Sequence, residues 1–168
     1  MRTLIVLDDR NYDPSWPSIA RYCVRAAVLQ DGLVALLRSA KAGFFKFPGG
    51  GIDSGESHQD TLIRETREEA GLTIRPGSEK ELGLVLERRR SMYCDEVFEQ
   101  YSYYYLADVL PGRVEQQLEQ HEKELGYELV WVDPRDAYEV DMTYAQTHPR
   151  ARYLYREAYV LGKLAGIL

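Results

Sequence analysis

Cysteine and histidine are scarce in this chain, and their scarcity limits the chemistry available to it. The chain has two cysteines, Cys23 and Cys94, in segments whose composition is typical of strands. Two cysteines so placed favour buried free thiols of a cytosolic protein over a disulfide. His58, His121 and His148 lack the close spacing of zinc ligands, so we do not expect a zinc site.

Long hydrophobic runs are also missing. No apolar stretch approaches the roughly 20 residues that a membrane-spanning helix needs. The N-terminal segment MRTLIVLDDR meets two aspartates after a short apolar run, and it therefore lacks the pattern of a signal peptide. Together with the few cysteines, these absences predict a cytoplasmic protein without a membrane partner.

Positive charge is outnumbered by negative charge. The 21 lysines and arginines stand against 27 aspartates and glutamates, which gives a net charge of −6 and no strong signal for nucleic-acid binding. Apolar residues make up 45% of the chain and charged residues 29%, as in folded globular proteins. With 168 residues and no internal repeat or linker, we expect a single domain over residues 1–168.

The most informative local pattern lies at residues 50–72, GGIDSGESHQDTLIRETREEAGL. Ser57 is a good helix N-cap, and Asp60, three residues later, completes a capping box. Gly71 is a good helix stop. These signals predict a helix over residues 58–70.

Three carboxylates fall on one face of that helix. Glu65, Glu68 and Glu69 are spaced by three and four residues, so we expect them to converge and to repel one another by a few tenths of a kcal/mol per pair. A cation should gather them, and oxygen ligands suit Mg²⁺ or Mn²⁺. The preceding segment, Phe47-Pro48-Gly49-Gly50-Gly51, lets a ligand approach the main chain, where a backbone carbonyl could complete the coordination.

The order and spacing of these residues resemble the Nudix box of MutT-type pyrophosphohydrolases. The resemblance rests on two glycines, an arginine, four glutamates and a final aliphatic residue: Gly50, Glu56, Arg64, Glu65, Glu68, Glu69, Gly71 and Leu72. Thr66 departs from the pattern, because a larger aliphatic residue is usual there. It falls on the packing face of the helix, so we expect its departure to affect stability rather than chemistry.

The resemblance implies a role for each residue of the motif. Glu68 and Glu69 would be the main metal ligands, with the Gly50 carbonyl beside them, and Glu65 would be a further ligand or the general base. Arg64 would hold the catalytic glutamate in place while pairing with Glu56. A metal-activated water would then attack phosphorus in a phosphoanhydride.

An acidic residue outside the box often assists in this family. The candidates lie in a charged segment before a predicted strand, and we choose Glu124, with Glu122 and Glu128 as alternatives. The expected substrate is a small nucleotide derivative, for which Arg38 could reach a phosphate and Phe47 could stack on a base. The tyrosines of the run 101–105 could line a pocket, pack the core or form a homodimer surface. The alternative function is a nucleotide sensor of the same fold without significant catalysis.

The wider pattern predicts strands interrupted by one internal helix and closed by a terminal helix. The strands are expected at residues 2–7, 22–30, 33–38, 81–90, 97–109 and 128–132, and a short turn or helix is expected to open at residues 133–134. Such an order indicates an α/β (α+β) domain. The resemblance adds the Nudix fold, a mixed β-sheet in an α/β/α sandwich, with residues 1–20 as an N-terminal extension and residues 148–166 as a C-terminal helix.

Overall fold

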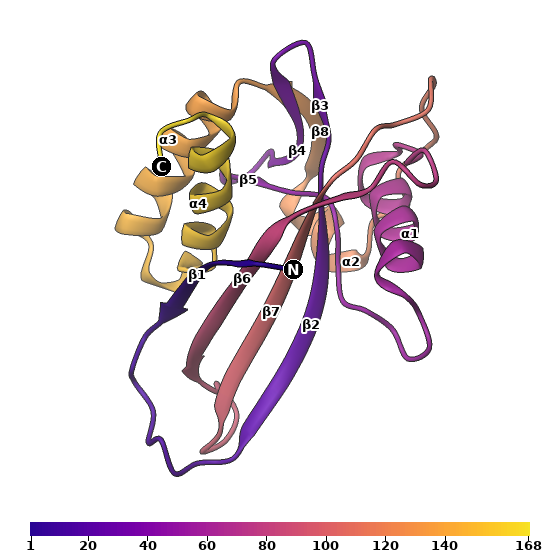
Figure 1. Cartoon of the computed structure of the whole chain (residues 1–168). Coiled ribbons are helices and arrows are strands. Elements are labelled where there is room, and N and C mark those ends of the chain that lie inside the picture. The colour runs from indigo at the N-terminus through magenta and orange to yellow at the C-terminus, as the bar shows by residue number, and fades with distance from the viewer.

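The computed structural model describes all 168 residues as two β-sheets with helices on both sides (Figure 1). The first sheet has the strand order β1-β6-β7-β2, with β1 at Thr3–Asp8, β6 at Lys80–Arg90, β7 at Val97–Leu106 and β2 at Ser18–Ala27. The pairs β1·β6 and β2·β7 are parallel and the pair β6·β7 is antiparallel, so the sheet is mixed. The N-terminal residues thus add an edge strand.

The second sheet is built around β4 (Leu33–Ser39). Its partners β3 (Leu29–Gln30), β5 (Phe45–Lys46) and β8 (Tyr127–Val132) all run antiparallel to it. The glycine-rich loop that follows β5 then runs beside β2, because the amide of Val24 donates to the Gly50 carbonyl at 3.0 Å. This loop therefore joins the two sheets.

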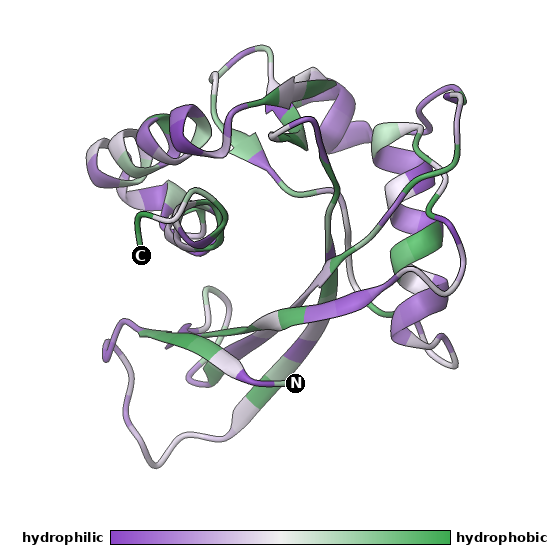
Figure 2. Cartoon of the chain, turned by 45° about the horizontal axis from the view of Figure 1, so that its top comes forward, coloured by the Kyte–Doolittle hydropathy of each residue, from purple (hydrophilic) through white to green (hydrophobic).

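The longer helices lie on opposite sides of the first sheet (Figure 2). Helix α1 (His58–Ala70) is on one side, and α3 (Pro134–Thr147) and α4 (Leu154–Leu164) are on the other. The short α2 (Gln120–Leu125) leads into β8. This arrangement confirms the predicted mixed sheet in an α/β/α sandwich. None of these helices combines the length and hydrophobicity that crossing a bilayer requires.

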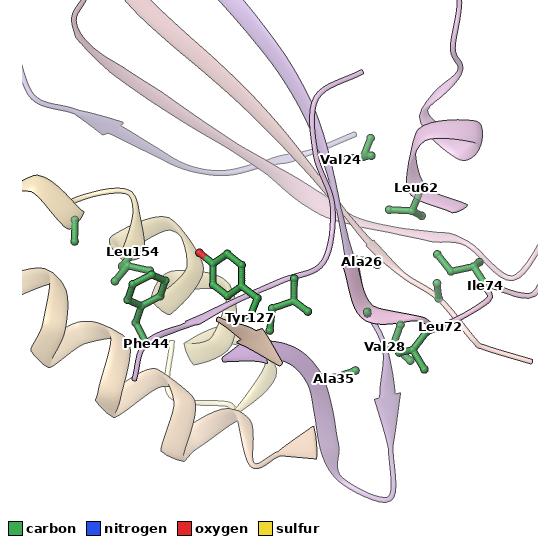
Figure 3. Close-up of a cluster of buried hydrophobic side chains, with 14 of the residues drawn as sticks. Val24, Ala26, Val28, Ala35, Phe44, Leu62, Leu72, Ile74, Tyr127 and Leu154 are labelled. Carbon is green, nitrogen blue, oxygen red and sulfur yellow. The ribbon is translucent and has the colours of Figure 1, made fainter. Parts of the chain in front are cut away.

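Two hydrophobic clusters hold the layers together. In the first, Leu62 of α1 packs toward Val24 of β2, while Phe44 and Tyr127 meet Leu154 at the other end of the cluster (Figure 3). The second cluster lies between the sheets and the pair α3–α4, and it includes the fully buried ring of Phe47. Burying one large apolar side chain contributes roughly 1.5–3 kcal/mol, so these two clusters hold the helices onto the sheets.

Two helices differ from the sequence prediction. The turn signal at residues 133–134 predicts only a short element, yet Asp133 caps a helix of 14 residues. The buried positions of this helix include Ala137 and Asp141, which are small or polar and give a weak hydrophobic period. The predicted C-terminal helix over 148–166 begins only at Leu154, because α3 ends at His148 and a short 3₁₀ turn at Pro149–Ala151 comes between.

The two cysteines are free thiols, as predicted, but only one of them is buried. Cys23 lies inside β2, with no exposed surface. Cys94 is exposed, because the segment between β6 and β7 is a loop rather than part of a strand. The prediction of two buried thiols is therefore wrong for Cys94.

Candidate active site

Helix α1 has the boundaries that its capping residues predict. The Ser57 side chain accepts a hydrogen bond from the Asp60 amide at 3.1 Å, and the Asp60 carboxylate accepts from the Ser57 amide at 3.2 Å. Gly71 ends the helix in the left-handed conformation with φ 68°. A side chain at Gly71 would also collide with the Val114 carbonyl. These local constraints fix where α1 begins and ends.

Arg64 is the centre of an ion-pair cluster on α1. Its guanidinium donates twice to the Glu56 carboxylate, with both distances 2.8 Å, and one nitrogen also reaches Glu65 at 2.7 Å and Glu68 at 3.3 Å. The hydrogen bonds from Arg64 lower the pKa of Glu56 to about 2. Arg64 therefore orients two carboxylates of the motif while Glu56 holds Arg64 itself.

Glu65 lies directly against Gly50. A β-carbon added at Gly50 would overlap the Glu65 carboxyl group, so only glycine leaves room for this side chain. Burial raises the pKa of Glu65, against the effect of the Arg64 hydrogen bond. The Gly50 carbonyl accepts from the Val24 amide, which leaves one lone pair for another partner. Gly50 and Glu65, two of the residues predicted for the metal site, thus lie side by side.

Glu69 points into the protein, unlike the more exposed Glu68. It is 4% exposed, and its carboxylate accepts from the Gly49 amide at 2.8 Å and from the Lys46 ammonium at 2.6 Å. Burial raises the pKa of Glu69 to about 8, although Lys46 opposes the shift. A carboxylate in this buried environment is stabilised by binding a proton or by a cation beside it.

Glu122 of α2 completes the buried group. Its carboxylate is 3.4 Å from the Lys46 nitrogen and accepts from the Glu119 amide at 2.9 Å. Burial alone would raise the pKa of Glu122, but its hydrogen bonds with Glu69 and Glu119 prevail and bring it to about 2. Glu69 and Glu122 therefore form a close pair of carboxyl groups around one ammonium group.

Alternate amides of the segment before the box are each held by a carboxylate from a different helix. The Phe45 amide donates to Asp141 of α3 at 2.8 Å, and the Phe47 amide donates to Glu157 of α4 at 3.1 Å. The Gly49 amide donates to Glu69 of α1. A hydrogen bond of this kind contributes roughly 0.5–1.5 kcal/mol, so the three together hold the segment from both sides.

Buried arginines extend this support. Arg156 donates to Glu157 at 2.7 Å and also pairs with Glu87 of β6. Arg25 of β2 donates to the Gly49 carbonyl and has its positive charge near Glu157. Removing one partner from such a buried group typically costs roughly 3–5 kcal/mol. The glycine loop is therefore anchored to the sheet and to α4 together.

The expected convergence of Glu65, Glu68 and Glu69 is wrong for this conformation. No three acidic, histidine or cysteine side chains come close enough to share one metal ion. The reason is the direction of Glu69, which is drawn to Lys46 and the Gly49 amide. Glu65 and Glu68 share one nitrogen of Arg64, and their oxygens, with the glycine loop beside Glu65, suit a hard divalent cation.

Three predicted site residues lie elsewhere than expected. Glu124 is exposed and accepts only from the Gln120 side chain, whereas Glu122 faces Glu69. Phe47 has no exposed surface and packs edge-on against Tyr104 behind the loop, so it cannot stack on a nucleotide in this conformation. Arg38 is exposed on β4, outside the ion-pair cluster.

Four charged residues support the box from outside it and are absent from the residues that the motif predicts. They are Arg25, Lys46, Asp141 and Glu157. The sequence signal for one of them is a lysine between three phenylalanines, in the run FFKF. Charged residues are rarely buried without a partner, so a lysine in an apolar run indicates a buried ion pair, as Lys46 forms with Glu69.

Comparisons with known proteins agree with this architecture. A family model described as the NUDIX domain matches residues 20–157. The uncharacterized Nudix hydrolase YvcI of Bacillus subtilis (strain 168) is 48% identical over 52 residues, which cover 30% of this chain and 33% of that protein. The match to this relative therefore spans only a third of its length.

Solved structures show the same fold. A MutT NUDIX hydrolase from Burkholderia pseudomallei has a TM-score of 0.52 and 23% identity, over 70% of this chain and 86% of that one. A NUDIX hydrolase from Nitrosomonas europaea has a TM-score of 0.54 and 19% identity, over 86% of this chain and 91% of that one. At these identities the likeness concerns the fold alone.

Proposed function

Because the chain belongs to the Nudix family of hydrolases, we propose that it is a Mg²⁺-dependent pyrophosphohydrolase of a nucleoside di- or triphosphate derivative. The observation that carries the proposal is the cluster around Arg64, in which one guanidinium holds Glu56, Glu65 and Glu68 beside Gly50. An Arg-oriented set of carboxylates against an open main-chain loop suits metal-assisted hydrolysis of a phosphoanhydride. Family members generally use divalent metal ions.

The chain's own residues would divide the work of water attack on phosphorus. Glu68 and the Gly50 carbonyl would hold the divalent ion, which neutralises phosphate charge and makes the attacking water more acidic. Glu65 would accept the proton of that water, and Arg64 would keep its carboxylate pointed at the loop.

The test is a hydrolysis assay over nucleoside triphosphates, dinucleotides, sugar nucleotides and ADP-ribose, with Mg²⁺ and product analysis. Glu65→Gln should lower turnover by at least roughly 100-fold with the thermal unfolding temperature retained. Glu139→Gln, an exposed glutamate of α3, is the matched control and should keep wild-type activity. Wild-type turnover by the Glu65 variant would overturn the assignment. Tight nucleotide binding without hydrolysis across the panel would favour a sensor.

A further inference from the structure

A cavity of about 600 Å³ lies beside the C-terminal end of α1, and none of its lining residues belongs to the ion-pair cluster or to the glycine loop. Its inner surface is apolar. Val28 and Leu72, which lie side by side in Figure 3, are buried there, and the half-buried Leu129 and Trp131 come from β8. Concave sites of roughly 300–1,000 Å³ with apolar walls and a few polar groups are typical of small-molecule binding.

One wall of this cavity is a loop that backbone hydrogen bonds hold at both ends. The amide of Leu110 donates to the Thr73 carbonyl at 2.8 Å, and the amide of Val114 donates to the Gly71 carbonyl at 2.9 Å. Between them Gly112 has a φ of 97°, which lets the chain turn back. The wall is thus formed without a ligand, so binding there needs little ordering of the chain.

The charged residues that line the cavity have no partner of opposite charge. The Arg75 amide donates to the Asp108 carbonyl at 2.8 Å, yet the two side chains form no ion pair. The guanidinium of Arg113 reaches only the Gln116 side chain, at 3.5 Å. Two arginines therefore stand against one aspartate, in a protein whose net charge is −6. Guanidinium groups without carboxylate partners suit an anionic group such as phosphate.

Trp131 gives the cavity an aromatic surface. Its indole N–H makes no hydrogen bond within the chain, and beside it Leu29 and Leu110 are 44% and 39% exposed. Apolar and aromatic walls suit a flat heteroaromatic ring, because such a ring stacks well on indole. The wall, the two arginines and the carboxylate of Asp108 thus match the base, the phosphate and the ribose hydroxyls of one nucleotide.

We propose that this cavity is a second nucleotide site, which binds a nucleoside monophosphate with its base against Trp131 and its phosphate at Arg75 and Arg113. The site shares no residue with the proposed metal-dependent centre at Glu65 and Glu68, and it needs no divalent ion. Binding there can therefore be measured without metal, independently of hydrolysis.

The experiment uses Trp131 as its own reporter. The chain has two tryptophans, so Trp16→Phe leaves Trp131 as the only indole. Titration of this protein with adenosine monophosphate in the presence of EDTA should quench the Trp131 fluorescence to saturation. Adenosine lacks the phosphate and should bind roughly 10-fold more weakly. Glu65→Gln, in the same background, should leave the affinity for adenosine monophosphate unchanged.

Substitution of the two arginines decides where the nucleotide binds. Arg75→Gln and Arg113→Gln, in the Trp16→Phe background, should each weaken the binding of adenosine monophosphate by roughly 10-fold, with the unfolding temperature retained because both side chains are exposed. Arg135→Gln, an exposed arginine of α3, is the matched control and should keep the affinity.

Two results would overturn the inference directly: no saturable quenching by adenosine monophosphate, or full affinity in both the Arg75 and the Arg113 variants. Trp131 fluorescence that changes with protein concentration in the absence of nucleotide would show that a second copy of the chain covers the cavity, and would overturn it as well. Failure of the proposed hydrolysis would appear instead as no turnover across the substrate panel, with the Trp131 quenching intact.

Discussion

Asp141 should make this protein lose stability as the pH rises from acid toward neutral. Its side chain is fully buried in α3, one oxygen accepts from the Phe45 amide, and the other has no hydrogen-bond partner. Burial raises the pKa of Asp141 from its ordinary value of 3.8 to about 8. Between these values the unfolded chain releases the proton while the folded chain keeps it, so the free energy of unfolding falls.

The size of this effect follows from the width of the window. Each pH unit between the unfolded and folded pKa costs roughly 1.4 kcal/mol, so the whole window amounts to on the order of 6 kcal/mol. Below the unfolded pKa the carboxyl group is protonated in both states and the full stability is present. Above the folded pKa both states are ionised and the loss is complete. Asp141→Asn has no proton to release and escapes this loss.

Urea unfolding at several pH values between about 4 and 8 measures the effect. The difference in unfolding free energy between Asp141→Asn and the wild type should shift in favour of the variant by roughly 1.4 kcal/mol per pH unit. Glu139→Gln, an exposed carboxylate on the same helix, should run parallel to the wild type. If the Asp141 variant also runs parallel to the wild type, the buried carboxyl group ionises normally and the reasoning fails.

Three further substitutions test other parts of the site. Thr66→Val should stabilise the fold by about 1 kcal/mol in urea unfolding, because the Thr66 hydroxyl is buried without a partner; destabilisation would contradict this. Gly49→Ala should cost about 3 kcal/mol or more by the same measurement, because the methyl group would collide with the Val24 carbonyl at a φ of 138°, whereas Gly77→Ala, at an open turn, should cost less. Arg64→Lys should lower kcat by roughly 10- to 100-fold with little change in unfolding temperature, since one ammonium group cannot span three carboxylates; equal kcat values would show that Arg64 orients nothing.

Long-range packing decides which acidic residue outside the box contacts Glu69 of α1. Glu122 and Glu124 lie two residues apart in one charged segment, and nothing in their sequence context favours the buried one. The direction of each side chain depends on how α2 rests against α1 and β5, and residues 69 and 122 are far apart along the chain. Local propensity carries no information about such a long-range contact.

Helix α1, in contrast, follows from the order of residues alone, because its neighbours along the chain specify both of its ends. Ser57, Asp60 and Gly71 set these ends through hydrogen bonds and a left-handed turn within a few residues. The ion pairs of Arg64 with Glu65 and Glu68 likewise join neighbours on the same helix. These interactions are local, so a reader of the sequence can derive them without knowing which segments pack together.

The partners of the glutamates on that helix depend instead on how distant segments pack. Glu69 turns toward Lys46 and the Gly49 amide, because β5 brings a largely buried ammonium group to that end of α1. Phe47 faces the core because α4 and the sheet pack over its ring. Burial and charge pairing between distant segments choose the partner of each side chain, whereas the motif specifies only which side chains are present.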